Sequence, residues 1–183
     1  LIRKIVISTG VVTTLAGTGS SGSSNGTGTS ASFNQPSGIT TDGTNLFLAE
    51  HNNNLIRKIV ISTGVVTTLA GTGSSGSANG TGTSASFNNP YGITTDGTNL
   101  YVSDTYNHLI RKIVISTGVV TTLAGTGSSG SANGTGTSAS FYKPYRITTD
   151  GTNLYVGDTF NHLIRKIVIS TGVVTTLAGT GSS

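Results

Sequence analysis

The strongest constraint on the fold is one stretch, LIRKIVISTGVVTTLAGTGSS, that occurs four times without a change. Its copies begin at residues 1, 55, 109 and 163, so the period is the same each time. A fixed period of this length indicates that one supersecondary unit is stacked repeatedly. Within each copy, two runs of β-branched and apolar residues flank a short Ser-Thr-Gly segment, and this pattern predicts a β-hairpin.

A second hairpin is predicted between successive copies. In the first repeat, segments 38–42 and 45–49 flank the turn dipeptide Asp42-Gly43, and the sequence TTDGTNL recurs at 94–100 and 148–154. Each period therefore supplies four short strands, at 38–42, 45–49, 55–62 and 64–70 in the first full repeat. The second and fourth of these strands carry apolar residues on both faces, so each needs a neighbour on either side.

Small four-stranded antiparallel sheets that cover one another are the blades of a β-propeller. We therefore predict an all-β chain, a β-propeller built from 54-residue four-stranded blades, with three full blades and one two-stranded half-blade. The half-blade is predicted at 1–21, and the blades, each with its preceding loop, at 22–75, 76–129 and 130–183. An open β-solenoid fits less well, because Asp-Gly hairpins make antiparallel meanders whereas solenoid coils are mostly parallel.

The connection from the fourth strand of one repeat to the next repeat is about 20 residues long, which is unusual in a compact domain. It is rich in Gly and Ser and contains one phenylalanine per repeat, at Phe33, Phe87 and Phe141. We expect these rings to pack and so to fix the loop.

Composition excludes several kinds of chemistry. The chain of 183 residues has no cysteine, which rules out disulfides, thiolate catalysis and cysteine-based metal sites. The net charge of +4 comes largely from an Arg-Lys pair that recurs in every copy, as at Arg57 and Lys58, and a periodic pair favours a scaffold role over a nucleic-acid patch. No apolar run is long enough to cross a bilayer. The Ser, Thr, Gly and Asn content, with the lack of cysteine, leads us to expect an extracellular or cell-surface location.

The residues around the second hairpin resemble a known repeat. The tripeptides at 107–109 and 161–163 read Asn-His-Leu, and PYGITTDGTNLYVSDTYNHLIRKI at 90–113 is similar to the NHL repeat throughout. The first repeat departs from the pattern, with Glu50, His51 and Asn54 where the later copies have Asp, Thr and His. The resemblance implies a propeller of about six blades that is used as a binding surface. Enzymatic members such as amidating lyases depend on metal and catalytic residues whose counterparts we do not find.

Three blades and a half-blade are too few for a closed ring, since propellers have roughly four to eight blades. We expect either that two chains combine toward a ring of about six blades, or that the chain is part of a longer polypeptide. The start of the sequence in the middle of a repeat fits the second possibility.

The positions that differ between repeats gather at one end of the predicted blades. The loops between repeats and the connections from the second to the third strand lie at this end, whereas the Asp-Gly and Ser-Thr-Gly turns of the other end never vary. The variable positions offer an aromatic and basic mixture suited to an anionic or sugar-like ligand or to a protein partner. We therefore predict a recognition surface; the alternative is that loops drift while strands do not. Its predicted residues are Tyr91, Tyr106, Tyr142, Lys143, Tyr145, Arg146 and Phe160.

Glu50, Asp104 and Asp158 recur at the end of the second strand and could surround one mouth of a propeller. Acid–base catalysis needs two carboxylates in different environments, but symmetry-related copies have similar environments. We expect each carboxylate instead to accept hydrogen bonds from nearby backbone and from the threonine that follows the aspartate, and to pair with an arginine of the third strand. His108 and His162 are likewise expected to be structural, because a metal site needs more converging ligands.

The sequence contains neither a phosphate-binding loop nor a nucleophile elbow. We therefore predict no catalytic residue, no metal and no cofactor. Asn-Gly-Thr occurs at Asn25, Asn79 and Asn133, and it accepts N-glycans only in a glycosylating secretory pathway. The function that we predict is a non-enzymatic binding or assembly module. The alternatives are a purely structural array or a fragment of a larger surface protein, a nucleic-acid or glycan binder and, last, a propeller hydrolase or lyase.

Overall fold

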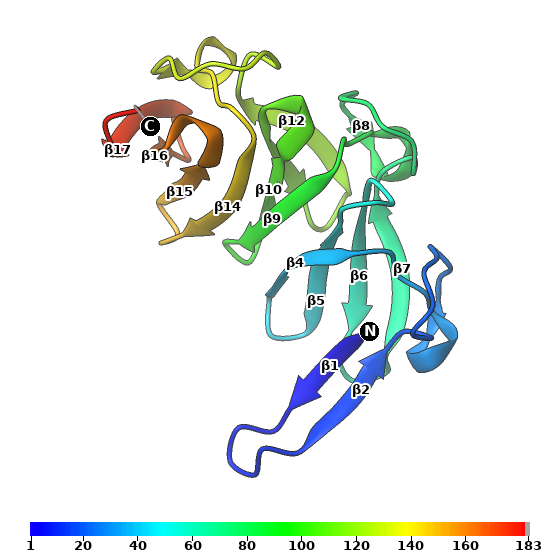
Figure 1. The fold of residues 1–183 in the computed structure, drawn as a ribbon. Coiled ribbons are helices and arrows are strands. Elements are labelled where there is room, and N and C mark those ends of the chain that lie inside the picture. The colour runs from blue at the N-terminus through cyan, green and yellow to red at the C-terminus, as the bar shows by residue number, and fades with distance from the viewer. Residues whose placement is uncertain (182–183) are drawn as a thin grey trace.

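The computed structural model describes residues 1–181, which form four antiparallel β-sheets arranged one after another along an arc (Figure 1). The first sheet has two strands and each of the other three has five. Both ends of the arc are open. The predicted all-β propeller architecture of three blades and a half-blade is confirmed; the predicted range 130–183 includes residues 182 and 183, which lie outside the described part.

The half-blade is the hairpin of β1 (Ile2–Ile5) and β2 (Val12–Ala16). Blade 1 contains β3 (Gly26–Thr27), β4 (Pro36–Thr41), β5 (Asn45–Glu50), β6 (Leu55–Val60) and β7 (Val65–Ala70). Blade 2 contains β8 (Gly80–Thr81), β9 (Pro90–Thr95), β10 (Asn99–Asp104), β11 (Leu109–Val114) and β12 (Val119–Ala124). Blade 3 contains β13 (Gly134–Thr135), β14 (Pro144–Thr149), β15 (Asn153–Asp158), β16 (Leu163–Val168) and β17 (Val173–Ala178).

Five short 3-10 helices lie in the connections of the described chain. Three of them are in the loops between repeats: η1 (Gly28–Ser30), η2 (Gly82–Ser84) and η4 (Gly136–Ser138). The other two, η3 (Thr105–Asn107) and η5 (Thr159–Asn161), directly follow β10 and β15.

The loop between repeats contributes a fifth strand that the sequence pattern did not predict. The order within blade 1 is β3-β7-β6-β5-β4, and β3 pairs with the start of β7. The N–H of Gly28 donates to the carbonyl of Gly64 at 2.9 Å, and the same bond recurs in the other two blades. The predicted anchoring by phenylalanine is confirmed, because Phe33, Phe87 and Phe141 are all buried. The long loop is thus part of the blade that follows it.

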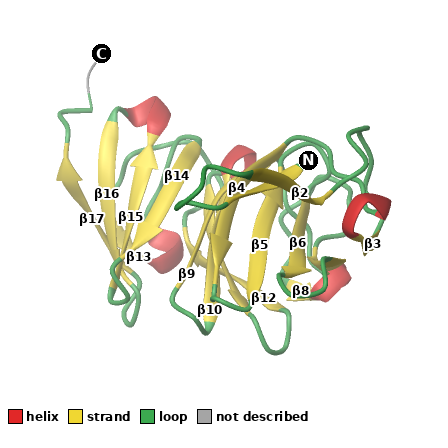
Figure 2. Ribbon diagram, turned by 90° about the horizontal axis from the view of Figure 1, so that it is seen from below, coloured by secondary structure: helices red, strands yellow, loops and turns green. Residues whose placement is uncertain are grey.

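Apolar layers between neighbouring blades form the core, as expected from strands that are apolar on both faces. The sheets stand side by side in Figure 2, with β4, β5, β9 and β10 next to one another. Phe47, Ala49 and Ile56 of blade 1 pack against blade 2. Their partners in blade 2 are Ala85, Phe87, Ile93, Leu100, Val102, Ile113 and Val120.

The two ends of the arc expose side chains that are buried elsewhere in the array. Ile164 of blade 3 is 43% exposed, whereas its repeat equivalents Ile56 and Ile110 are fully buried between blades. At the other end, Ile5 of the half-blade is 61% exposed, whereas its equivalent Ile59 is buried. Ile5 and Ile164 therefore differ from their buried equivalents in their surroundings and not in residue type.

Candidate functional site

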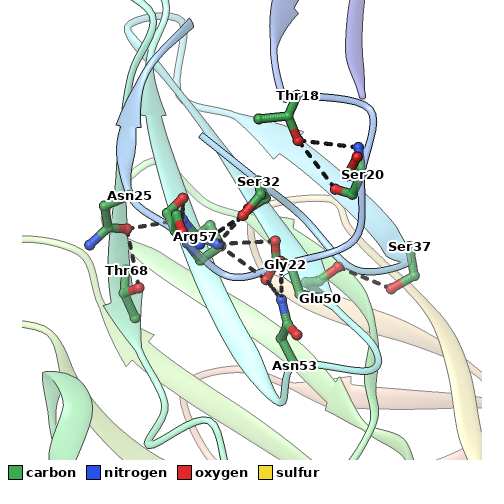
Figure 3. Close-up of polar contacts among 12 residues, drawn as sticks. Thr18, Ser20, Gly22, Asn25, Ser32, Ser37, Glu50, Asn53, Arg57 and Thr68 are labelled. Atoms are coloured by element: carbon green, nitrogen blue, oxygen red, sulfur yellow. Dashed lines mark hydrogen bonds and ion pairs between the residues drawn. The ribbon is translucent and has the colours of Figure 1, made fainter. Parts of the chain in front are cut away.

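Each full blade holds one arginine that is completely buried at its variable end. In blade 1, Nη1 of Arg57 donates to Oε1 of Glu50 at 3.1 Å and to the carbonyl of Ser32 at 3.3 Å. Nη2 donates to the carbonyl of Ser24 at 3.1 Å and to Oδ1 of Asn25 at 2.9 Å. Figure 3 shows the guanidinium group at the centre of these contacts. The arginine therefore ties the loop between repeats to the sheet.

The same arrangement uses the recurring carboxylates of blades 2 and 3. Asp104 lies 2.8 Å from Arg111, and Asp158 lies 3.0 Å from Arg165, all with fully buried side chains. Asp104 also accepts hydrogen bonds from the backbone N–H of Asn88 and from the side chain of Asn107, each at 2.8 Å. The predicted backbone hydrogen bonds and the pairing with arginine are confirmed, whereas the predicted bond from the following threonine is wrong, because Oγ1 of Thr105 donates to the carbonyl of Pro144 at 2.8 Å.

The Asn-Gly-Thr segments have a structural use in this network. Asn25, Asn79 and Asn133 each present Oδ1 to a buried arginine at 2.9 Å. A side chain on the following glycine would crowd the backbone of the 3-10 turn, since a Cβ at Gly80 would lie 3.0 Å from the carbonyl oxygen of Ser84. Packing therefore accounts for the Asn-Gly pair without a glycan.

Several variable positions adopt a left-handed backbone. The φ angle is +58° at His108, +54° at Asn54 and +49° at Lys143. Asparagine adopts this conformation more readily than most residues with a side chain, whereas lysine gains no local hydrogen bond that offsets the strain. Lys143 is thus held in a strained conformation at the end of the molecule where the repeats differ.

All seven residues of the predicted recognition surface lie together in the structure. The rings of Tyr91 and Tyr145 meet edge to face with centroids 4.9 Å apart, and Tyr145 stacks on Phe160 at 6.3 Å. Phe160 in turn contacts Tyr142 at 5.3 Å. We call the set Tyr91, Tyr106, Tyr142, Lys143, Tyr145, Arg146 and Phe160 the aromatic surface.

Two cations lie over these rings. The Nζ atom of Lys143 is 4.6 Å from the centroid of Tyr106 and 4.9 Å from that of Phe160, and the guanidinium carbon of Arg146 is 4.8 Å from the centroid of Tyr91. Each distance is within the range of a cation–π contact. The aromatic surface therefore presents positive charge beside flat apolar rings.

Two histidines border the aromatic surface. The sequence did not indicate that either belongs to it. His51 contacts Tyr91 with ring centroids 5.8 Å apart, and His108 contacts Tyr142 at 5.6 Å. Burial is the largest factor that lowers the pKa of both imidazoles, so both are neutral near pH 7. Burial and the nearby Tyr106 raise the pKa of Tyr145, so this hydroxyl also stays neutral.

A depression of about 420 Å³ opens at one side of the aromatic surface. Its walls come from the start of β4, from the turn after β5 and from the first residues of β9 and β14. They are formed by Gln35, Pro36, Ser37, His51, Tyr91 and Tyr145. Three blades thus contribute to one concave area.

The acidic side chains nearest the aromatic surface are buried beneath it, and Asp158 accepts a hydrogen bond from the backbone N–H of Tyr142 at 2.7 Å. Glu50, Asp104 and Asp158 are buried against arginine, and Asp42, Asp96 and Asp150 accept hydrogen bonds in the Asp-Gly turns at the opposite end of the blades. Within residues 1–181, no three His, Asp or Glu side chains gather as a metal site, and no helix has the length and apolar character of a membrane span.

The similarity to known proteins extends over most of the chain. No family model matches the sequence. NHL repeat-containing protein 2 of Homo sapiens is 33% identical over 163 residues, which is 80% of this chain and 22% of the human protein. The chain belongs to the NHL-repeat β-propeller family. A chloroplastic protein of Arabidopsis thaliana, SUPPRESSOR OF QUENCHING 1, is 34% identical over 177 residues, or 89% of this chain and 17% of that protein. These NHL repeats therefore span about a fifth of the curated relatives that they match.

Solved structures agree on the fold of the NHL repeats. A protein of unknown function from Bacteroides thetaiotaomicron superposes with a TM-score of 0.75 at 25% identity, over 94% of this chain and 42% of that one. An auxiliary nutrient binding protein from the same organism superposes with a TM-score of 0.73 at 22% identity, over 96% of this chain and 43% of that one.

Proposed function

We propose that this NHL array is a non-enzymatic binding module whose aromatic surface recognises an anionic, sugar-like ligand. The observation that carries the proposal is the separation of charge. Lys143 and Arg146 lie over aromatic rings at the variable end, while every Asp and Glu side chain is either buried against arginine or at the opposite end.

Aromatic rings and cations are suited to two parts of such a ligand. A sugar ring can lie flat against Tyr or Phe, and a carboxylate or sulfate can pair with Lys143 or Arg146. A protein partner with an acidic patch is the second candidate.

The positions of the carboxylates do not favour catalysis at the variable end of the blades. Asp104 and Asp158 are fully buried, and each is held by an arginine and an asparagine, so neither is placed to exchange a proton with a ligand on the surface. We therefore do not propose a hydrolase or a lyase. Nor do we propose a nucleic-acid site, since the surface has only two cations that do not belong to the periodic Arg-Lys pairs.

Affinity measurements test the proposal. We expect a sulfated or uronic-acid hexasaccharide to bind, and uncharged maltohexaose not to bind. The double substitution Tyr145→Ala and Arg146→Ala should abolish binding without lowering the thermal unfolding temperature, because neither side chain is fully buried. Unchanged binding by the double variant would show that the surface is wrongly assigned. If only a purely structural array is present, no charged ligand binds.

The open half-blade end of the arc favours association with further blades, either of a second copy or of a longer chain. Ile5 is exposed there, whereas its repeat equivalent Ile59 is buried. Light scattering on a sizing column distinguishes these cases, since a dimer indicates self-association and a monomer indicates that the missing blades come from elsewhere. An extracellular or cell-surface location is part of the same proposal, and secretion of the parent protein tests it.

A further inference from the structure

At each interface between full blades, one glycine lies against the backbone of the next blade. Gly38 of blade 1 faces the start of β9, and a Cβ on Gly38 would overlap the carbonyl oxygen of Tyr91 and lie 3.0 Å from the backbone nitrogen of Ile93. Gly92 of blade 2 faces the start of β14 in the same way, in overlap with the carbonyl oxygen of Tyr145. These atoms belong to the backbone, so they cannot move aside as a flexible side chain would. Docking of a complete blade therefore requires glycine at this position of the preceding blade.

The third blade has arginine at this position. Arg146 is the repeat equivalent of Gly38 and Gly92, and it is exposed on the open side of blade 3. It pairs with Gly157 across the ladder, and its side chain extends over the ring of Tyr91. Most of the open face is unchanged from the inner blades, since Ile164, Leu177 and Ala178 repeat Ile110, Leu123 and Ala124, although Gly157 stands where blade 2 has Ser103. Arg146 is the one residue whose position conflicts with a blade docked as blades 2 and 3 are docked.

We infer that Arg146 is a selectivity residue for assembly, which prevents a complete repeat from stacking on blade 3. The open face keeps the apolar side chains that bind a neighbour, but its closest contact point is blocked by a Cβ and by the side chain beyond it. Overlap with a backbone atom cannot be relieved without moving the whole incoming blade. This inference is independent of the ligand proposed for the aromatic surface.

A single thiol provides the test, because the chain contains no cysteine. A fourth repeat is added as a copy of residues 76–129 after residue 183, and Ile164→Cys reports whether the open face becomes covered. With arginine at position 146, we expect the thiol to react with a maleimide as fast as in the chain without the added repeat. With Arg146→Gly, we expect the reaction to slow at least about tenfold, as protection by packing requires.

The natural array supplies the matched control. Ile110→Cys in blade 2 is buried beneath blade 3 and should react slowly. Adding Gly92→Arg should raise its rate, because the arginine then stands at the contact between two blades that are already docked. Gly38→Arg with Ile56→Cys repeats the comparison at the first interface, and circular dichroism checks that each variant remains folded.

The outcomes separate cleanly. Protection of the thiol in the glycine form alone supports the inference. Protection in both forms, or in neither, overturns it, because residue 146 then does not decide whether the blade docks. A fast reaction at position 110 only after Gly92→Arg gives independent support, and an unchanged rate there contradicts the inference.

Discussion

The imidazole of His108 in blade 2 accepts a hydrogen bond at Nδ1 from the backbone N–H of Lys143 in blade 3, over 3.1 Å. At the preceding interface, Oδ1 of Asn54 accepts the equivalent bond from the N–H of Asn89 at 2.8 Å. Two different side chains thus provide the same acceptor between neighbouring blades. Only one of them can be protonated, and it lies beside the aromatic surface.

This difference predicts a pH-dependent contribution to stability. Burial and then the charge of Lys143 lower the pKa of His108, so the folded state favours the neutral ring. A histidine whose pKa is lower in the folded state than in the unfolded state stabilises the fold at pH values above its unfolded pKa of about 6.5. This contribution is lost as the pH falls through the pKa of the folded state. We expect the thermal unfolding temperature to fall as the pH is lowered below about 6.5.

His108→Asn is the matched control for this prediction, since asparagine already performs the role at position 54. In this variant the thermal unfolding temperature should depend less on pH, while the contribution of His51 to that dependence should remain. Identical pH profiles for the two proteins would rule out His108 as the titrating group.

Lys143→Asn should raise stability and weaken binding. Asparagine occupies the equivalent position 89 in the same left-handed conformation, with φ of +51°. Removal of the strained lysine should increase the free energy of unfolding by up to about 1 kcal/mol, as denaturant titration measures. The loss of a cation from the aromatic surface should lower the affinity for an anionic ligand and the salt dependence of that affinity. An increase in stability with unchanged affinity would exclude Lys143 from the ligand site.

Asp104→Asn should destabilise the fold strongly. The substitution leaves the guanidinium group of Arg111 buried without its carboxylate, which costs about 3–5 kcal/mol. Arg3→Ala provides the control, because Arg3 is the half-blade's repeat equivalent of Arg111 and is exposed. We expect this variant to change the free energy of unfolding by no more than about 0.5 kcal/mol. Both values come from the midpoint and slope of urea unfolding. A small effect of Asp104→Asn would mean that the arginine network contributes little to the fold.

Gly92→Ala should lower stability by about 1–3 kcal/mol, because the added methyl group overlaps the carbonyl of Tyr145 in the next blade. Gly157→Ala is the comparison, since its nearest neighbour would be the Cβ of Arg146 at 3.7 Å, an ordinary contact distance. Equal effects of the two substitutions in thermal unfolding would contradict the close approach at Gly92.

The sequence predicted the elements that depend on local pattern. The Asp-Gly turns and the β-branched runs define both hairpins of each blade, and the constant period requires their stacking. Strand β3 was missed because so short a strand carries no periodic signal, and its pairing with Val65 and Val66 joins segments far apart in the chain. The bond from Arg57 to Asn25 was missed because it, too, joins segments that are distant in sequence.

The residues of the aromatic surface could be predicted from the sequence because they differ between repeats that are otherwise nearly identical. His51 was not selected, since the first repeat departs from the NHL pattern just at this turn. Its contact with Tyr91 depends on how blade 1 meets blade 2, which no single repeat shows. The sequence did not predict the role of Gly38 and Gly92 either, because it depends on how closely backbone atoms of the next blade approach these glycines.

The most direct test of the binding proposal is an NMR titration that follows the backbone amide signals of the isotopically labelled protein. The protein is titrated with a sulfated hexasaccharide, and maltohexaose is the uncharged reference. The account predicts amide shift changes at residues 91, 106, 142, 143, 145, 146 and 160 that saturate with the charged sugar and are absent with the uncharged one. Saturable changes confined to the Asp-Gly turns at the opposite end, or no saturable change with the charged sugar, would contradict it.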